Sequence, residues 1–219
     1  MNETRVPNQR ILAEYNVCKD CITAVITPEH EVVKYLEDSG SAHRRVIWQM
    51  GSNLIEKVYK LDFKLERLLL ANEINAYSEL FDLQGTLLPF FYFATSNCPD
   101  YTIPVEENLT GVVVENVEDH SRFVTLARWK KTTPKRLSQH KNQRVFQNAV
   151  KGLTQIHDRG VVHGAVSEEN ILVDLYTHGV VFKNFENSMF RRVMKRSAFE
   201  RLKLREKDRL RQLLIPTAV

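Results

Sequence analysis

The sequence predicts an α+β protein, with an antiparallel sheet in its N-terminal half and mostly helices in its C-terminal half. Short apolar runs bounded by turn residues recur through the first 116 residues, as in the strands of a sheet. Apolar residues at helical spacing occupy 145–157 and again 189–214. The chain has 219 residues, of which 43% are hydrophobic, and this is enough for a packed core.

The N-terminal half is predicted to contain one helix and five strands after an irregular lead-in over residues 1–30. The strands are expected at 31–37, 44–50, 54–61, 87–94 and 110–116, and the helix at 64–82. Residues 116–120 are the expected hinge, because they follow the last strand and precede a mostly helical half. The chain therefore divides at about residue 116, into residues 1–116 and residues 117–219.

The C-terminal half begins with the basic stretch 128–141, which is expected to be a loop around Pro134 that joins two helices. The next predicted helix covers 145–157 and ends before Gly160. Two apolar runs, Ile171–Val173 and Val180–Phe182, predict a short hairpin. The apolar stripe from residue 189 onwards predicts terminal helices that pack against the rest of this half.

Residues 163–174 read His-Gly-Ala-Val-Ser-Glu-Glu-Asn-Ile-Leu-Val-Asp. This segment resembles the catalytic loop of protein kinases, His-Arg-Asp-x-x-x-x-Asn, in which the Asp accepts a proton from the attacking hydroxyl and the Asn binds magnesium. His163 and Asn170 have the required spacing, and the resemblance gives His163 and Gly164 a structural role. Ala165 occupies the position of the base, and a methyl group cannot accept a proton.

Asn184-Phe185-Glu186 directly follows the predicted hairpin. The resemblance places the metal-binding Asp-Phe-Gly of kinases here, so an amide, Asn184, stands where the second carboxylate is expected. Magnesium prefers a carboxylate, and Asn170 and Asn184 remain as neutral metal-ligand candidates. Loss of a general base alone lowers a rate by roughly 10²–10⁴. We therefore assign no catalytic residue and treat Ala165 and Asn184 as degenerate positions.

A kinase also needs a lysine that contacts the phosphates and a helix glutamate that holds this lysine. Lys60 ends the predicted strand 54–61 and Glu73 lies in the predicted helix, so we expect these two to pair. The resemblance extends to small kinase-like proteins common in fungi, whose metal motif is often Asp-Phe-Glu. The residues that carry it are Asn72–Leu80, Gln84-Gly85, Pro89 and Thr110–Glu115.

Nucleotide-binding candidates follow from this resemblance. They are Lys60, Glu73, Glu115, Val117 and Asn170. The covering Gly-x-Gly-x-x-Gly loop of kinases is not matched, because the turn over residues 38–42 holds a single glycine, Gly40. With one glycine, the side chains of the other turn residues would keep backbone N–H groups from approaching phosphate oxygens closely.

The net charge of +4 is concentrated near the C-terminus, where ten basic and three acidic residues fall within 189–212. This segment could bind a nucleic acid or an acidic partner, or it could be the solvated face of packed helices. No run of residues is apolar and long enough for a membrane span, and no signal sequence is recognisable. The expected location is therefore the cytoplasm or the nucleus.

The sequence thus predicts a two-lobed protein-kinase-like fold with a reduced C-terminal lobe. The favoured function is that of a pseudokinase, a binding or regulatory module with a protein partner and no useful phosphoryl transfer. It requires no cofactor, and ATP with or without magnesium remains a possible ligand. One alternative is an atypical active phosphotransferase that uses ATP on a protein or a small molecule. Another is a nucleic-acid-binding protein that uses the basic segment 189–212.

Overall fold

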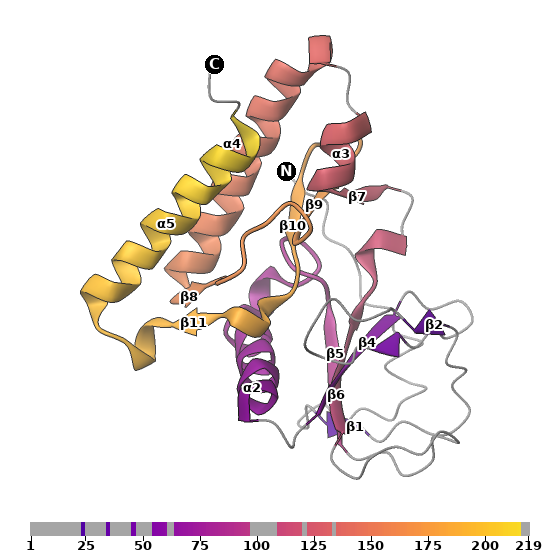
Figure 1. The fold of residues 1–219 in the computed structure, drawn as a ribbon, viewed down its shortest axis with the longest axis vertical. Coiled ribbons are helices and arrows are strands. Elements are labelled where there is room, and N and C mark those ends of the chain that lie inside the picture. Colours follow the sequence, from indigo (N-terminus) through magenta and orange to yellow (C-terminus); the bar gives the residue numbers. More distant parts are fainter. Residues whose placement is uncertain are drawn as a thin grey trace.

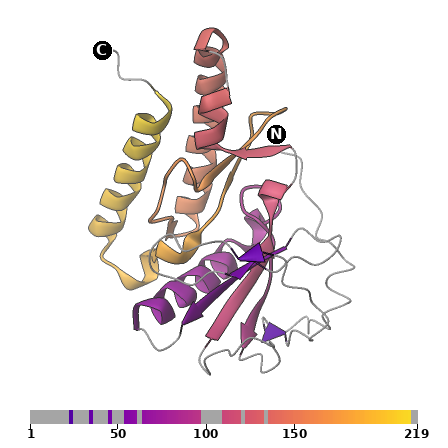
Figure 2. The same ribbon diagram turned by 45° about the vertical axis from the view of Figure 1, so that its right-hand side comes forward.

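A computed structural model of the chain describes residues 54–60, 64–96, 109–119, 122–132 and 135–215, together with three strands of two residues each. These parts form a mixed α+β fold (Figures 1 and 2), which confirms the predicted class. The strands are β1 (Thr23–Ala24), β2 (Lys34–Tyr35), β3 (Arg45–Val46), β4 (Leu54–Lys60), β5 (Phe91–Ser96), β6 (Leu109–Glu115), β7 (Phe123–Thr125), β8 (Val161–Val162), β9 (Ile171–Asp174), β10 (Val180–Phe182) and β11 (Met189–Phe190).

Four α-helices and four short 3₁₀ turns complete the described elements. The helices are α2 (Lys64–Glu79), α3 (Leu126–Thr132), α4 (Lys135–Asp158) and α5 (Arg196–Leu214). The 3₁₀ turns are η1 (Phe81–Leu83), η2 (Val117–Asp119), η3 (Phe185–Asn187) and η4 (Arg191–Val193). In this described part of the chain, no helix is both long and apolar enough to cross a bilayer.

The largest sheet has the strand order β1-β5-β6-β4. Its central pairs are antiparallel, and β4 faces β6 from Leu54 opposite Glu115 to Lys60 opposite Leu109. β1 runs parallel to β5, so the expectation of a wholly antiparallel sheet is wrong at this edge. Of the strands expected at 31–37 and 44–50, the structure describes only the short antiparallel pair of β2 with β3; their other residues lie outside the described part.

Helix α2 packs against β4 on one side and η3 on the other. Its buried face includes Leu70, Ala76 and Tyr77, at the spacing of a helix stripe. The ring of Tyr77 lies 5.4 Å from that of Phe91 and 5.7 Å from that of Phe185. α2 therefore joins the sheet to the C-terminal half of the chain. It ends at Glu79, earlier than the predicted 82, because residues 81–83 tighten into the 3₁₀ turn η1.

Helices α4 and α5 run antiparallel, side by side, along one edge of the molecule (Figures 1 and 2). The loop expected at 128–141 is wrong, since α3 extends to Thr132 and α4 begins at Lys135. Lysine, arginine and glutamine are good helix formers, which favours helices on these basic stretches. Gly160 follows the end of α4 and has a positive φ of 80°. This conformation suits a residue without a side chain.

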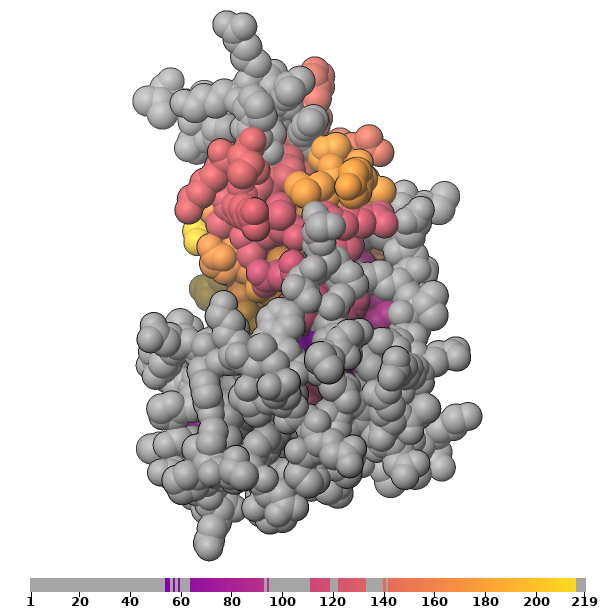
Figure 3. Space-filling view, turned by 90° about the vertical axis from the view of Figure 1, so that its right-hand side faces the viewer, coloured from indigo at the N-terminus to yellow at the C-terminus, as the bar shows by residue number. Residues whose placement is uncertain are grey.

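The C-terminal half also contains two small sheets. β9 and β10 form the predicted hairpin, with Val173 opposite Val180 and Ile171 opposite Phe182, and β7 adds to the other side of β9. Figure 3 shows this hairpin (orange) beside the segment that contains β7 and α3 (pink). β8 pairs with β11, so the segment after η3 returns to the end of α4, where the loop of residues 163–170 begins.

Candidate functional site

The loop over residues 163–170 joins β8 to β9, and His163 holds its first turn in place. The His163 side chain is fully buried. Its Nε2 donates a hydrogen bond to the Lys183 carbonyl oxygen, 3.0 Å away, and its Nδ1 accepts one from the Ala165 N–H, at 3.2 Å. The ring lies 4.6 Å from that of Phe185. One donor and one acceptor nitrogen define a neutral imidazole.

Burial is the largest cause of the shift in the His163 pKa, and it lowers this pKa below the usual 6.5. The negative charge of Glu206 acts in the opposite direction, whereas the positive charge of Lys57 adds to the lowering. The folded protein thus keeps His163 neutral at a pH at which an exposed histidine takes up a proton.

We expect the free energy of unfolding to fall as the pH drops below about 6.5. In that range the unfolded chain binds a proton at His163 that the folded chain does not bind, so protonation favours unfolding; the stability is fully present above that pH. The variant His163→Gln retains an amide donor for the Lys183 carbonyl but does not titrate. Between pH 5 and 7, the free energy of unfolding from denaturant melts should therefore depend less steeply on pH for this variant than for the wild type. An equal pH dependence would refute a neutral His163 in the folded protein.

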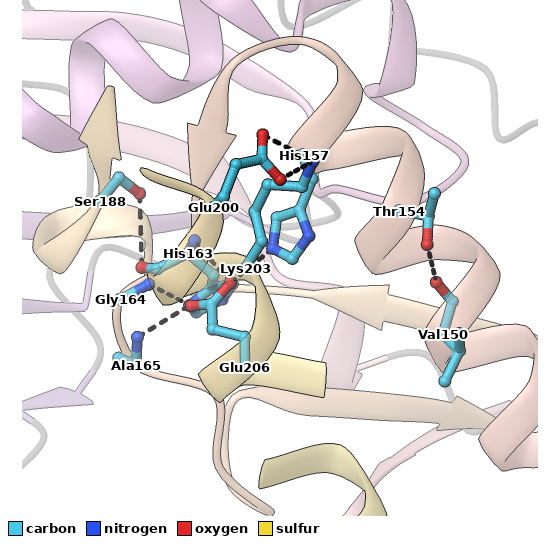
Figure 4. A network of polar contacts seen from close by, with 10 residues as sticks. All are labelled: Val150, Thr154, His157, His163, Gly164, Ala165, Ser188, Glu200, Lys203 and Glu206. Carbon is cyan, nitrogen blue, oxygen red and sulfur yellow. Dashed lines mark hydrogen bonds and ion pairs between the residues drawn. The ribbon is translucent and has the colours of Figure 1, made fainter. Parts of the chain in front are cut away.

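Glu206 of α5 holds the same loop from below (Figure 4). Its carboxylate accepts hydrogen bonds from the backbone N–H groups of His163, at 3.2 Å, and Gly164, at 2.6 Å. It also lies 2.8 Å from Nε2 of His157 in α4. Glu206 is only 8% exposed. The last helix thus fixes the backbone of the loop through one buried side chain.

Sequence reasoning did not identify Glu206 or His157. A usable signal was present, because Glu206 lies four residues after Leu202 and four before Leu210, on the apolar stripe of α5. A carboxylate on a buried stripe needs donors, and the loop supplies two.

The three residues expected around the metal position come together in the structure. Asn170 Nδ2 donates to the Ala165 carbonyl oxygen, at 2.9 Å, and Asn184 Nδ2 donates to Asn170 Oδ1, at 2.6 Å. We call Asn170 and Asn184 the amide pair. Asn184 has a φ of 64°, in the left-handed region that Asn tolerates better than most residues.

The amide pair does not fit a magnesium ion. Asn170 Oδ1, the atom that would bind the metal, already accepts a hydrogen bond from Asn184. Both groups are neutral, whereas magnesium is usually bound through carboxylates. Within the described residues, no three His, Cys, Asp or Glu side chains gather as a ligand set. Asn170 Nδ2, Asn170 Oδ1 and Asn184 Nδ2 are all engaged in hydrogen bonds within this group.

The carboxylates nearest in sequence to Ala165 and Asn184 are engaged elsewhere. Glu168 pairs with Lys130 of α3, at 2.5 Å, and Lys130 also donates to the Leu213 carbonyl in α5. Glu186 is buried and lies 3.3 Å from the Tyr59 hydroxyl in β4. Neither contact directs a carboxylate towards the place that Ala165 occupies.

The lysine that contacts Glu73 in the structure is Lys57; the side chain of Lys60, the expected partner, lies outside the described residues. Glu73 is fully buried and forms an ion pair with the Lys57 ammonium. Glu73 also accepts a hydrogen bond from the Tyr59 hydroxyl, at 2.5 Å. Positions 57 and 59 lie on one face of β4, since side chains alternate along a strand, and this face is the one that meets Glu73.

This buried group joins β4, α2 and η3. Tyr59 lies between Glu73 and Glu186, and Asn72 donates to the Glu186 backbone carbonyl oxygen, at 3.3 Å. Glu186, the residue after Phe185, is thereby held through both its side chain and its backbone. The amide pair and the Lys57–Glu73 ion pair thus flank η3.

The remaining nucleotide-binding candidates have internal contacts. Glu115 is 8% exposed, and its carboxylate accepts a hydrogen bond from the Phe90 N–H, at 3.1 Å. Val117 is 2% exposed and packs with Leu172 and Val181. Next to Val117, Glu118 forms an ion pair with Lys183, the residue that precedes Asn184.

No model of a known protein family matches the chain, and no curated protein matches it at a significant level. The functional conclusion therefore depends on the site itself.

Proposed function

We propose that this chain is a pseudokinase, a kinase-like module that binds or regulates a protein partner and does not transfer phosphate at a useful rate. The observation that carries the proposal is the amide pair beside Ala165: no base stands at the position of the proton acceptor, and the metal-ligand oxygen of Asn170 accepts a hydrogen bond from Asn184 instead. Phosphoryl transfer depends on charge neutralisation by metal ions, and this pair offers magnesium only neutral groups.

The arrangement of the elements supports a two-lobed kinase-like fold for this proposal. In the part of the chain that the structure describes, a sheet with helix α2 precedes residue 116, and a mostly helical part follows residue 117. The ion pair between Lys57 and the helix residue Glu73 resembles the lysine–glutamate pair of kinases. The His163 contact with the carbonyl before Asn184 likewise links the catalytic-loop position to the metal-motif position.

The alternative of an atypical active phosphotransferase needs a carboxylate near the amide pair. Glu168 and Glu186 are held by Lys130 and Tyr59 respectively, so neither supports it. The alternative of a nucleic-acid-binding protein depends on the basic segment of α5.

The proposal is tested by phosphoryl transfer and by thermal melting with ATP. We expect no transfer to the protein itself or to generic substrates, and any stabilisation by ATP should be small and unchanged by magnesium. A ligand at a hundred times its Kd adds about 2.7 kcal/mol, so tight binding would be visible in the melt. Sustained transfer that Lys57→Ala abolishes would support the atypical enzyme and reject the pseudokinase.

Restoring the carboxylate should create a magnesium site if the amide pair occupies the metal position. In Asn184→Asp, a carboxylate oxygen faces Asn170 Oδ1 without a donor between them, so we expect the variant to be less stable by about 1–3 kcal/mol. Magnesium should reverse that loss, because a cation can bind between the two oxygens.

The double variant Ala165→Asp with Asn184→Asp should in addition gain magnesium-dependent ATP binding by calorimetry. The single variant Ala165→Asp is the matched control and should gain none. A folded double variant whose affinity for ATP ignores magnesium would show that the metal position has been misassigned.

A further inference from the structure

The outer face of α5 carries a line of arginines. Arg201, Arg205 and Arg209 are exposed and follow one another at intervals of four residues, about 6 Å along the helix axis. The opposite side of the helix, with Phe199, Leu210 and Leu213, is buried and packs towards α4. The arginines are therefore displayed on a rigid element.

The carboxylates of α5 do not neutralise this line. Glu200 pairs with Lys203 and Asp208 with Arg211, while Glu206 is turned inward to the loop. Among the described residues, no carboxylate forms an ion pair with Arg201, Arg205 or Arg209. Three guanidinium groups on one helix face are thus left for an acidic partner.

Two exposed apolar residues accompany the arginines. Leu204 in α5 is 62% exposed, and Ile215, which directly follows the last residue of α5, is 48% exposed. Exposed apolar side chains often mark a protein-interaction site, and an amphipathic helix is a common occupant of such a surface.

We propose that the outer face of α5, with Arg201, Leu204, Arg205 and Arg209, together with Ile215 just after the helix, binds an acidic amphipathic helix of a partner protein. Carboxylates four residues apart on that helix match the spacing of the arginines, and a guanidinium binds a carboxylate through two parallel hydrogen bonds. Apolar residues on the neighbouring stripe of the partner would cover Leu204 and Ile215.

Two other anionic partners fit less well. A helix that lies on a membrane inserts its apolar face into the lipid, but the apolar face of α5 is packed inside the protein. Phosphate groups of a nucleic acid would pair with the arginines and leave Leu204 and Ile215 uncovered. The face contains no residue of the amide pair or of its contacts, so this inference does not rest on the proposed function.

The test measures binding of a fluorescent peptide to the full chain by anisotropy. The probe is a helical peptide of about twenty residues, with glutamate at every fourth position and leucine on the adjoining stripe. We expect Arg201→Glu combined with Arg205→Glu to raise the Kd by at least about tenfold, and Leu204→Ala by about fivefold. A peptide of the same composition in scrambled order should bind more weakly.

The matched control reverses two exposed charges on the neighbouring helix, Arg144→Glu with Lys151→Glu, and should change the Kd by less than about twofold. Circular dichroism establishes that every variant keeps its helix content. Failure of the wild-type chain to bind the patterned peptide, or an equal loss in the control variant, overturns the proposal. Tighter binding of a single-stranded RNA oligonucleotide, unaffected by Leu204→Ala, would overturn it in favour of a nucleic-acid partner.

Discussion

The variant Gly164→Ala is expected to lose about 3–5 kcal/mol of stability, the largest effect of any single methyl group in the loop. Gly164 has a φ of 80°, a conformation that costs a residue with a side chain about 1–2 kcal/mol. A Cβ built there would lie 1.9 Å from the Asn187 carbonyl oxygen, and this contact is with backbone, which cannot rotate away. The loop would therefore have to move off η3.

Gly160→Ala is the matched control for that prediction. Gly160 also has a φ of 80°, but the nearest atom to its Cβ would be 3.5 Å away, in Arg191. This variant should lose only the conformational part, about 1–2 kcal/mol. Denaturant melts measure both losses. Equal losses at the two glycines would show that the close approach of Gly164 to Asn187 does not constrain the protein.

Removal of the Glu206 carboxylate should be nearly as damaging. Glu206→Ala leaves the buried N–H of His163 and the part-buried N–H of Gly164 without their acceptor, and buried His157 loses its partner. Each buried polar group left unsatisfied costs about 1–3 kcal/mol, so we expect a loss of about 3 kcal/mol or more. In a chain of this size, that loss lowers the melting temperature by roughly 6–12 °C.

Two further variants of α5 separate the role of this carboxylate from a general effect on the helix. Glu206→Gln keeps one acceptor oxygen and should lose less than half as much stability. Glu200→Ala removes an exposed glutamate from the same helix and should change stability by less than about 0.5 kcal/mol. The hydrogen-exchange protection of residues 163 and 164 should fall in Glu206→Ala alone. Unchanged protection there would contradict the proposed contacts.

Local spacing predicted the parts of the fold and site that lie close together in the sequence. The hairpin of β9 and β10 followed from two apolar runs with a turn between them, and the start of α2 followed from its periodicity. Ala165, Asn170 and Asn184 meet because that hairpin brings the two ends of one short segment together. Each of these inferences depended on the chemistry of a continuous stretch.

Contacts between distant segments could not be predicted in the same way. The sequence does not show which face of β4 meets α2, and it therefore does not single out Lys57 as a partner of Glu73. Glu206 and His157 are 49 residues apart and meet only when α5 folds back along α4. The polarity of residues 128–141 suggests a loop, although the lysines, arginines and glutamine in this stretch are good helix formers.

The main core crosses the boundary that the sequence suggested at residue 116. Ala76, Tyr77 and Leu88 from before that point share one buried cluster with Leu153, Phe182 and Phe185 from after it. The Phe182 N–H also donates to the Leu87 carbonyl oxygen, at 2.8 Å. Neither half can open without exposing the apolar surface of the other. Unfolding of this core should therefore be one cooperative transition with coincident curves for all probes, and a fragment cut at residue 116 should not melt as an independent unit.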